Sequence, residues 1–220
     1  MVTMTPERWD STSSYINVVL GDSDSDLDAM RARTKSEGLP DIAISSGVGH
    51  ALTLLVRAAR TRVALEVGTL GGYSAAWIAR GLDRDGRLIT IEREPAYAAF
   101  AARELAGLSL GPKIEVRQGD ALAVLGGLEE ELGAESLDFA FVDADKSQYL
   151  DYWRAIDPCL KPGAIFVADN ALGTGSWWID ELDHPERRGV HALNQALADH
   201  PGYDTALFPL REGLLVALKR

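Results

Sequence analysis

Residues 63–80, VALEVGTLGGYSAAWIAR, contain the stretch that decides the fold. A short apolar run, Val63–Val67, leads into a turn with three glycines and then into a helical segment, Tyr73–Arg80. Glycine lets the backbone turn tightly and approach a ligand closely, although a turn without a ligand would have the same sequence. A strand, a turn and a helix in this order predict one unit of a parallel sheet with helical crossovers.

The alternation of strand and helix continues along the chain. Further strands are expected at Leu88–Ile91, Ile114–Val116, Leu137–Val142 and Ala164–Ala168. The helices between and after them are expected at Pro95–Ala106, Ala121–Leu132, Gln148–Ile156 and His191–Ala198. Two last strands, Tyr203–Leu207 and Leu214–Leu218, are joined by a short link and predict an antiparallel hairpin at the sheet edge. The predicted fold is an α/β, doubly wound sheet of seven mostly parallel strands.

The first 60 residues lack this alternation and predict helices. Short helices are expected at Ser14–Leu20 and Gly47–Arg60, and the acidic run Asp22–Asp26 is typical of the start of another helix. An EF-hand would need a glycine and a distal glutamate at fixed offsets, so a solvated helix start is favoured over a metal loop. We therefore expect a single domain over 1–220, with a helical extension at 1–60 and the α/β core at 61–220.

Composition limits the class of protein. Of the 220 residues, 46% are hydrophobic, which suffices for a real core and excludes disorder as the main state. The net charge of −11 disfavours a general nucleic-acid surface or an anionic membrane as partner. Cys159 is the single cysteine, so no intramolecular disulfide can form, and no segment resembles a secretory signal or a membrane span. We expect a soluble, cytoplasmic protein.

In a doubly wound sheet, ligands bind beyond the carboxyl ends of the strands. Ser74 falls in the first turn of a helix, where its hydroxyl and free N–H groups can hold a carboxylate. Glu92 ends the second strand, where an acidic residue can bind ribose hydroxyls of a nucleoside-bearing cofactor, a nicotinamide dinucleotide included. Asp120 is placed to cap a helix, and its position also suits the amino group of an adenine.

Acidic and amide side chains follow the next two strands. Asp143 comes directly after one strand, and Asp169 and Asn170 follow the other. Turn chemistry alone could explain each group. Together they supply two carboxylates and an amide oxygen, which are hard ligands suited to Mg²⁺, Mn²⁺ or Ca²⁺. The pattern therefore predicts a divalent cation site at this edge.

These segments resemble the cation-dependent, class I S-adenosylmethionine O-methyltransferases, which include catechol and caffeoyl-CoA O-methyltransferases. The matching motifs lie in order between Leu65 and Arg220: LEVGTLGGYSAAWIA, ITIERE, QGDAL, DFAFVDADKSQYLDYW, LKPGAIFVADNAL and EGLLVALKR. The pair VDADK and ADN is the specific part, since many methyltransferases share the glycine loop. The resemblance implies a Rossmann-like methyltransferase fold, a bound S-adenosylmethionine and a divalent cation.

The resemblance also implies a role for each matching position. The methionine end of the cofactor would be held by Glu66, Gly68 and Ser74. The ribose would be bound by Glu92, and the adenine bordered by Asp120 and Ala121. The metal ligands would be Asp143, Asp169 and Asn170, with Asp143 also close to the cofactor. The catalytic residues would be Lys146 and Asp143, with Lys146 serving as a general base or as a fixed positive charge beside a phenolate.

Departures from the family pattern lie at positions that flank the acceptor in relatives. Val48-Gly49-His50 stands where Glu-Gly-Gln is usual, and Asp145 stands where catechol O-methyltransferase has an aromatic residue. The loop 173–183 carries Trp177 and Trp178, which could form an apolar lid, core packing or a subunit interface.

The expected activity is transfer of a methyl group to a hydroxyl of a small aromatic or vicinal-diol acceptor. Methylation of a hydroxylated uridine in tRNA is an alternative within the family, and the net charge of −11 disfavours it. A nicotinamide-dependent dehydrogenase is the alternative of another class, and it gives no reason for the acidic groups after strands four and five. A cofactor-binding subunit without activity is a third reading. Relatives are commonly dimers, so we expect a homodimer formed through the N-terminal helices.

Overall fold

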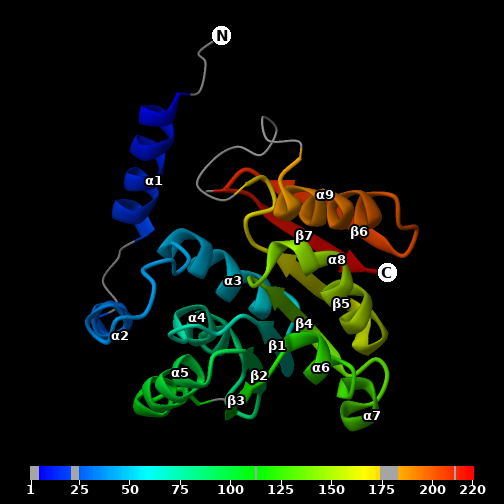
Figure 1. The fold of residues 1–220 in the computed structure, drawn as a ribbon, viewed down its shortest axis with the longest axis horizontal. Helices are drawn as coiled ribbons and strands as arrows, with labels where there is room; N and C mark the ends of the chain where they lie inside the picture. Colours follow the sequence, from blue (N-terminus) through cyan, green and yellow to red (C-terminus); the bar gives the residue numbers. More distant parts are fainter. Residues whose placement is uncertain (1–4, 21–24, 112, 174–182, 211) are drawn as a thin grey trace.

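The computed structural model describes residues 5–20, 25–111, 113–173, 183–210 and 212–220. In these ranges the chain forms a seven-stranded sheet in the order β3-β2-β1-β4-β5-β7-β6 (Figure 1). Strands β1 to β5 are parallel, β7 is antiparallel to β5, and β6 is antiparallel to β7. The strands are β1 (Val63–Val67), β2 (Arg87–Glu92), β3 (Lys113–Gln118), β4 (Leu137–Val142), β5 (Leu160–Ala168), β6 (Tyr203–Phe208) and β7 (Leu214–Lys219). The predicted sheet with its terminal hairpin is confirmed.

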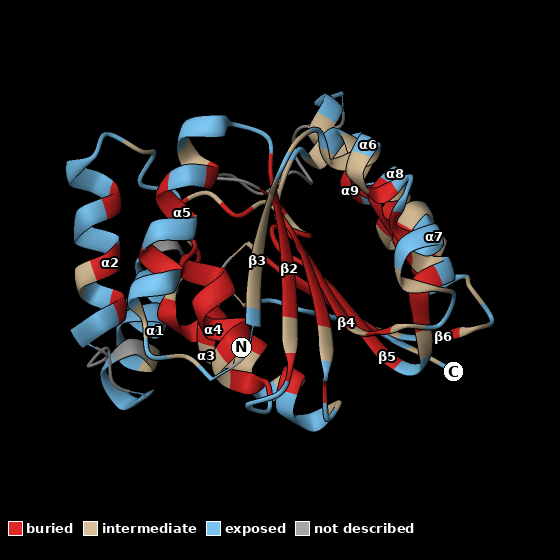
Figure 2. Ribbon diagram, turned by 90° about the horizontal axis from the view of Figure 1, so that it is seen from below, coloured by how far each residue is buried: buried red, intermediate tan, exposed pale blue. Residues whose placement is uncertain are grey.

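Helices cover both faces of the sheet (Figure 2). One face carries α1 (Pro6–Leu20), α2 (Ser25–Ser36), α3 (Ser46–Ala58), α4 (Tyr73–Gly81) and α5 (Pro95–Gly107). The other face carries α6 (Ala121–Leu125), α7 (Leu128–Leu132), α8 (Tyr149–Ile156) and α9 (Pro185–Ala198). Along β4, Phe139 and Phe141 pack into one core and Ala140 and Val142 into the other. A central parallel strand is therefore apolar on both faces, as its sequence predicts.

Several predicted helix boundaries were wrong. The single helix expected at Ala121–Leu132 is two helices, because Gly126 and Gly127 interrupt it and let Leu125 and Leu128 both reach the core. Helix α1 begins at Pro6 rather than Ser14, and α9 begins at Pro185 rather than His191. Proline favours the first turn of a helix, and this signal lies upstream of the apolar residues that suggested the later starts.

The N-terminal helices are attached to the core close to the glycine-rich turn. Nε of Arg33 in α2 donates a 2.6 Å hydrogen bond to Oε2 of Glu104 in α5, whose side chain is 7% exposed. A Cβ atom at Gly71 would lie 2.6 Å from the hydroxyl oxygen of Thr34, so the turn and α2 are in close contact. In the part of the chain that the structure describes, no helix is long and apolar enough to span a membrane.

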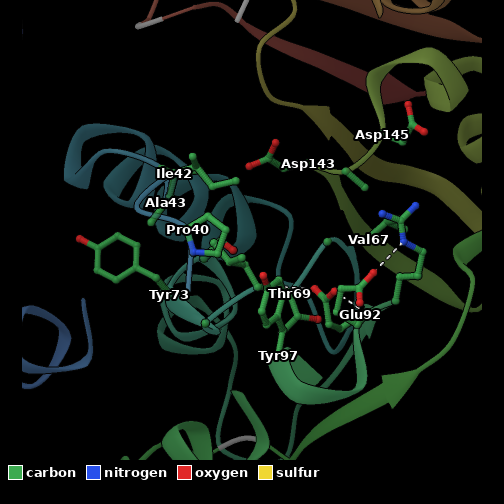
Figure 3. A pocket seen from close by; sticks show the side chains of 18 of the residues that line it. Pro40, Ile42, Ala43, Val67, Thr69, Tyr73, Glu92, Tyr97, Asp143 and Asp145 are labelled. Carbon is green, nitrogen blue, oxygen red and sulfur yellow. Dashed lines mark hydrogen bonds and ion pairs between the residues drawn. The ribbon is translucent and has the colours of Figure 1, made fainter. Parts of the chain in front are cut away.

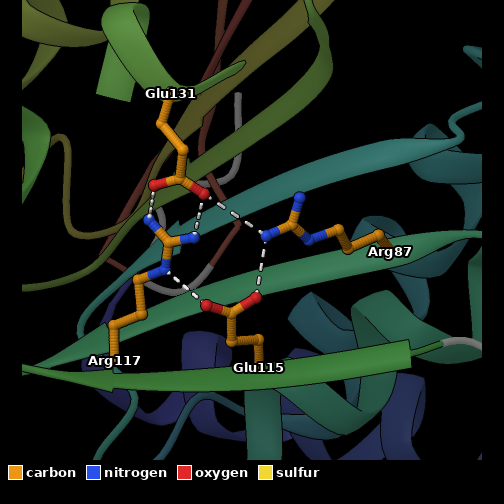
Figure 4. Close-up of polar contacts among 4 residues, drawn as sticks. All are labelled: Arg87, Glu115, Arg117 and Glu131. Atoms are coloured by element: carbon orange, nitrogen blue, oxygen red, sulfur yellow. Dashed lines mark hydrogen bonds and ion pairs between the residues drawn. The ribbon is translucent and has the colours of Figure 1, made fainter. Parts of the chain in front are cut away.

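A four-membered charge network supports β3 at one edge of the sheet (Figure 4). Arg117 in β3 donates two hydrogen bonds of 2.6 and 2.7 Å to Glu131 of α7, and a third of 2.8 Å to Glu115. Arg87 in β2 donates a 2.8 Å hydrogen bond to Glu115 and lies 3.5 Å from Glu131. The network joins two strands and a helix, and it places alternating charge along an edge strand.

Candidate active site

A cavity of about 690 Å³ opens at the carboxyl ends of the parallel strands. The strand ends form part of its wall, and α2 with the segment that joins α2 to α3 forms another part. Figure 3 shows Pro40, Ile42 and Ala43 gathered on one side of this cavity, apart from Glu92 and Tyr97. Eight of the ten residues predicted for the site line it: Gly68, Ser74, Glu92, Asp120, Ala121, Asp143, Lys146 and Asn170. The other two, Glu66 and Asp169, are buried and do not line the cavity themselves, but each is next in the sequence to a residue that does.

The glycine-rich turn after β1 has a backbone that other residues would not adopt without strain. Gly68 has φ of +99°, and a Cβ atom there would lie 2.1 Å from the carbonyl oxygen of Asp143. Gly72 precedes α4 with φ of +86°, and Leu70 between them has φ of +47°. Because a leucine is unusual in the left-handed region, the surrounding contacts must hold it there. The turn brings bare backbone to the cavity wall, which suits close approach by a ligand.

The carboxylate of Glu92 is fixed by two backbone donors. The N–H of Leu70 donates to its Oε2 at 2.8 Å, and the N–H of Glu94 donates to its Oε1 at 2.9 Å. The residue is 8% exposed and lines the cavity. Each carboxylate oxygen has further lone pairs, so Glu92 can accept hydrogen bonds from ligand hydroxyls without giving up either contact. This geometry fits a cofactor ribose.

Glu66 lies behind the cavity wall and is fully buried. Its Oε2 accepts a 2.5 Å hydrogen bond from Oγ1 of Thr90, and Thr90 lies 2.5 Å from Oγ1 of Thr69. Burial raises the pKa of Glu66 to about 8, against the lowering effect of hydrogen bonds from Ser74 and Thr90. The predicted cofactor residue is therefore a buried acid whose contacts with the cavity run through hydroxyl groups.

Asp120 lines the cavity together with three residues that were not among the predicted site residues. Asp120 caps α6 by accepting a 3.1 Å hydrogen bond from the N–H of Ala123, as predicted. The Tyr152 hydroxyl donates a 2.8 Å hydrogen bond to Oε1 of Gln148, and burial raises the pKa of Tyr152 to about 12. Tyr97, Gln148 and Tyr152 all line the cavity. Sequence reasoning assigned no role to these three: Gln148 and Tyr152 stand in the motif DFAFVDADKSQYLDYW, which was the available signal, and Tyr97 shortly follows the predicted second strand.

Asp143 and Lys146 form an ion pair at the cavity wall. Nζ of Lys146 donates a 2.7 Å hydrogen bond to Oδ1 of Asp143, and the two side chains are 14% and 20% exposed. The same Nζ lies 5.8 Å from the centroid of the Tyr149 ring. The Tyr149 hydroxyl donates to the backbone oxygen of Asp169 at 3.2 Å. The lysine is therefore held between a carboxylate and an aromatic face, beside the cavity.

The predicted metal ligands lie at the ends of two neighbouring strands. The N–H of Asp169 donates to the oxygen of Val142 at 3.1 Å, which fixes Asp169 next to the strand that ends at Asp143. Asn170 has φ of +54°, is 7% exposed and lines the cavity. Among the described residues, no three His, Cys, Asp or Glu side chains gather closely enough to hold a metal. The set has only two carboxylates, and its oxygen chemistry fits a hard cation.

The positions that depart from the family pattern do not all reach the cavity. His50 packs its ring 4.6 Å from the ring of Trp77, and a Cβ atom at Gly49 would lie 2.5 Å from the same indole. This segment therefore closes the contact between α3 and α4, while Asp145 does line the cavity. Trp177 and Trp178, for which the sequence leaves a lid, core packing or a subunit interface open, lie outside the described residues.

Comparison with known proteins identifies the class. Residues 13–220 match the family described as O-methyltransferase. A catechol O-methyltransferase from Niastella koreensis is 34% identical over 210 residues, which are 94% of this chain and 93% of the relative. An O-methyltransferase from Bacillus cereus, solved in complex with SAH, has a TM-score of 0.88 and 31% identity, covering 97% of this chain and 99% of its own. TomG from Streptomyces achromogenes, solved with SAM, has a TM-score of 0.86 and 33% identity, with 99% of both chains covered.

The chain belongs to the O-methyltransferase family, and its fold is that of the S-adenosylmethionine-dependent class. It is an S-adenosylmethionine-dependent O-methyltransferase. This assignment displaces the nicotinamide-dependent dehydrogenase and the inactive cofactor-binding subunit that the sequence left open.

Proposed function

We propose that the protein transfers the methyl group of S-adenosylmethionine to a hydroxyl of a small catechol-like or vicinal-diol acceptor, with the help of a divalent cation. The observation that carries the proposal is that Asp143, Lys146 and Asn170 line the same cavity as the glycine-rich turn and Glu92. The groups suited to the reaction and the groups suited to the cofactor thus share one space. The catechol O-methyltransferase relative supports an acceptor of this kind.

The cation would be held by Asp143, Asp169 and Asn170. When bound, the cofactor supplies the methyl group and the cation supplies Lewis acidity toward the acceptor oxygens. Two carboxylates and one amide favour Mg²⁺, with Mn²⁺ or Ca²⁺ as alternatives. Asp143 has one oxygen engaged by Lys146 and a second oxygen for a ligand, so ion pairing and metal binding are compatible.

Lys146 handles the charge of the reacting oxygen. A phenol with a pKa near 10 is about one-thousandth ionised at pH 7, so the ionised oxygen needs a positive neighbour. The charged amine of Lys146 has three hydrogens, and one of them is donated in the 2.7 Å hydrogen bond from Nζ to Oδ1 of Asp143. Another is available to hold a phenolate oxygen in place, and a neutral Nζ would accept the phenol proton. Asp143 keeps this amine at the cavity wall in both cases.

An apolar part of the cavity wall suits the ring of an aromatic acceptor. Pro40, Ile42 and Ala43 line the cavity on the segment between α2 and α3 (Figure 3). Ile42 is 66% exposed, and a bound ring would cover it. An exposed isoleucine at a cavity mouth is an unfavourable feature that acceptor binding would relieve.

We also propose a homodimer. The α1 side chains of Tyr15, Val18, Val19 and Leu20 are between 49% and 81% exposed. Four large apolar side chains on one projecting helix are typical of an interface.

The test is methyl transfer from S-adenosylmethionine to a panel of catechols, with and without Mg²⁺, before and after chelation. We expect activity that chelation abolishes and Mg²⁺ restores. Activity unchanged by chelation would contradict the metal mechanism. If the cofactor binds and no catechol is methylated, the acceptor proposal fails, and tRNA is the next substrate to assay.

Two variants separate the roles of the residues. Lys146→Met should lower kcat by about 10²- to 10⁴-fold, because a positioned acid–base or charged group contributes on that order. Lys161→Met is the matched control, since Lys161 pairs with Asp138 at 2.6 Å near the opposite ends of β4 and β5. The control should retain wild-type kcat.

A further inference from the structure

Three buried polar residues form a continuous hydrogen-bonded chain beneath the cavity. Glu66 of β1 and Thr90 of β2 are direct neighbours in the parallel register. The Thr90 hydroxyl lies 2.5 Å from Glu66 Oε2 and 2.5 Å from the Thr69 hydroxyl. Glu66 and Thr90 are fully buried and Thr69 is 1% exposed. No motif assigns a role to either threonine, yet buried polar groups placed in this way are costly unless they are satisfied.

The direction in which the hydrogen bonds of this series are donated depends on the charge of Glu66. A hydroxyl has one proton to donate. When Glu66 is ionised, Thr90 must donate to it, and Thr69 must then donate to Thr90. When Glu66 is protonated, it can donate to Thr90, and Thr90 can donate to Thr69. Both states keep the contacts among Glu66 Oε2 and the two hydroxyls, so the threonines let this oxygen gain or lose a proton without losing its partner. The other oxygen of Glu66, Oε1, is buried and has no hydrogen-bond partner among the described residues.

The chain connects the buried acid to the cavity wall. Thr69 lines the cavity, and so does Ser74, whose hydroxyl lowers the pKa of Glu66. The other charged groups that act on Glu66 are the carboxylates of Asp143 and Glu92, and both raise its pKa. Neither of these two carboxylates stabilises the ionised form of Glu66, and Asp143 is itself paired with Lys146. A positively charged ligand in the cavity would favour the ionised form of Glu66.

We propose that Thr90 and Thr69 are positioning residues for the cofactor: through Glu66 they set the negative potential under the cationic methionine end of S-adenosylmethionine. The inference rests on the proposed cofactor site and assigns a function to two residues of the matching motifs for which the resemblance implies no role. Cofactor binding should release a proton near pH 7.5, because burial raises the pKa of the free acid to about 8. Affinity should rise with pH as Glu66 ionises.

The test is calorimetric binding of S-adenosylmethionine from pH 6.5 to 9, in buffers of different ionisation enthalpy, without metal or acceptor. Thr90→Val removes the donor to ionised Glu66 and keeps the shape. We expect about ten-fold weaker binding at pH 7.5, with the rise in affinity displaced to higher pH. Thr90→Ser keeps the hydroxyl and should bind within about two-fold of wild type.

Thr61→Val is the matched control. Thr61 is 2% exposed, and its hydroxyl has no hydrogen-bond partner among the described residues. The control should leave the affinity and its pH profile unchanged. Wild-type affinity and pH profile in Thr90→Val would overturn the proposal, and so would equal losses in Thr90→Ser and Thr90→Val, which would indicate packing.

If Thr90→Val does not fold, Thr69→Val tests the same chain from its outer end. It removes the donor that orients Thr90 and should shift the pH profile in the same direction by a smaller amount. An unchanged profile would overturn the proposal. Because neither metal nor acceptor is present, these outcomes are independent of the catechol and cation assays.

Discussion

The backbone N–H of Leu70 donates a 2.8 Å hydrogen bond to Oε2 of Glu92. This contact joins the strained residue of the glycine-rich turn, with φ of +47°, to the end of the neighbouring strand. The carboxylate stabilises the turn, and the turn in exchange fixes the carboxylate. The site that we propose for the cofactor is therefore already ordered without a ligand, which reduces the entropy lost on binding.

Glu92→Gln should weaken S-adenosylmethionine binding. A glutamine offers one acceptor oxygen and would turn its NH₂ toward one of the two backbone donors. A hydrogen bond to a charged group contributes about 1.5–3 kcal/mol, so we expect a Kd about 10- to 100-fold higher by calorimetry. Glu130→Gln, an exposed glutamate on α7, is the control and should bind normally. An unchanged Kd in Glu92→Gln would remove Glu92 from the cofactor site.

Gly68→Ala should lose both stability and cofactor binding. The new Cβ atom would lie 2.1 Å from the Asp143 carbonyl oxygen, and φ is +99°. Gly163→Ala is the matched control, because Gly163 has φ of +86° and nothing within 4 Å of its added Cβ. The left-handed conformation alone costs about 1–2 kcal/mol, which is the loss expected for Gly163→Ala in urea unfolding. A larger loss of stability in Gly68→Ala than in Gly163→Ala measures the cost of the clash with Asp143. Equal losses of stability would show that the turn relaxes to avoid the clash.

Arg117→Met should lower stability at neutral pH and flatten its acid dependence. Hydrogen bonds from Arg87 and Arg117 lower the pKa of Glu115, and those from Arg117 lower the pKa of Glu131. A lowered carboxyl pKa stabilises the fold above the ordinary pKa of about 4.3, and this contribution is lost as pH falls through the lowered value. The melting temperatures of wild type and Arg117→Met should therefore differ at pH 7 and coincide near pH 3.

Arg154→Met is the control for the charge network. Arg154 makes one exposed contact of 3.5 Å with Asp151, a geometry that contributes little. Its unfolding curve should match wild type at every pH. A difference between wild type and Arg117→Met that persists at pH 3 would assign the loss to packing of the arginine stem instead.

Val18→Asp should convert a dimer into a monomer. Val18 on α1 is 81% exposed, and a carboxylate buried in an interface would be unfavourable. Light scattering should give twice 23.8 kDa for the wild type and 23.8 kDa for the variant. Ser13→Asp adds the same charge elsewhere on the helix and should remain dimeric. A monomeric wild type would refute the proposed interface.

The succession of strands along the chain and the sheet edge that carries the candidate site could be predicted from sequence because both depend on local patterns. Apolar runs and glycine-rich turns locate the strands, and the polar residues just after them must lie at one edge. The break at Gly126–Gly127 was missed because the apolar spacing continues across it. Two adjacent glycines were the available signal, and they outweighed the periodicity.

Other parts of the site depend on contacts between distant segments. The pairing of Glu66 with Thr90 needs the register of β1 and β2, and these two residues lie 24 positions apart in the sequence. The wall formed by Pro40 and Ile42 depends on where α2 docks, and Arg33 and Glu104 lie 71 residues apart. Such long-range geometry has no local pattern, so only the folded chain reveals it.

Two parts of the chain form the cavity wall, and they differ in how far a substitution would disturb the fold. Asp143 and Asp169 are held by the ladder between β4 and β5, where a slip of one residue would reverse every side chain. Residues 39–44 carry Pro40, Ile42 and Ala43 and belong to no strand or helix. We therefore expect that substitutions in this short connector can change which acceptor binds while Asp143 and Asp169 stay in place. For an engineer, grafting this connector between relatives is the smallest exchange expected to retarget the enzyme.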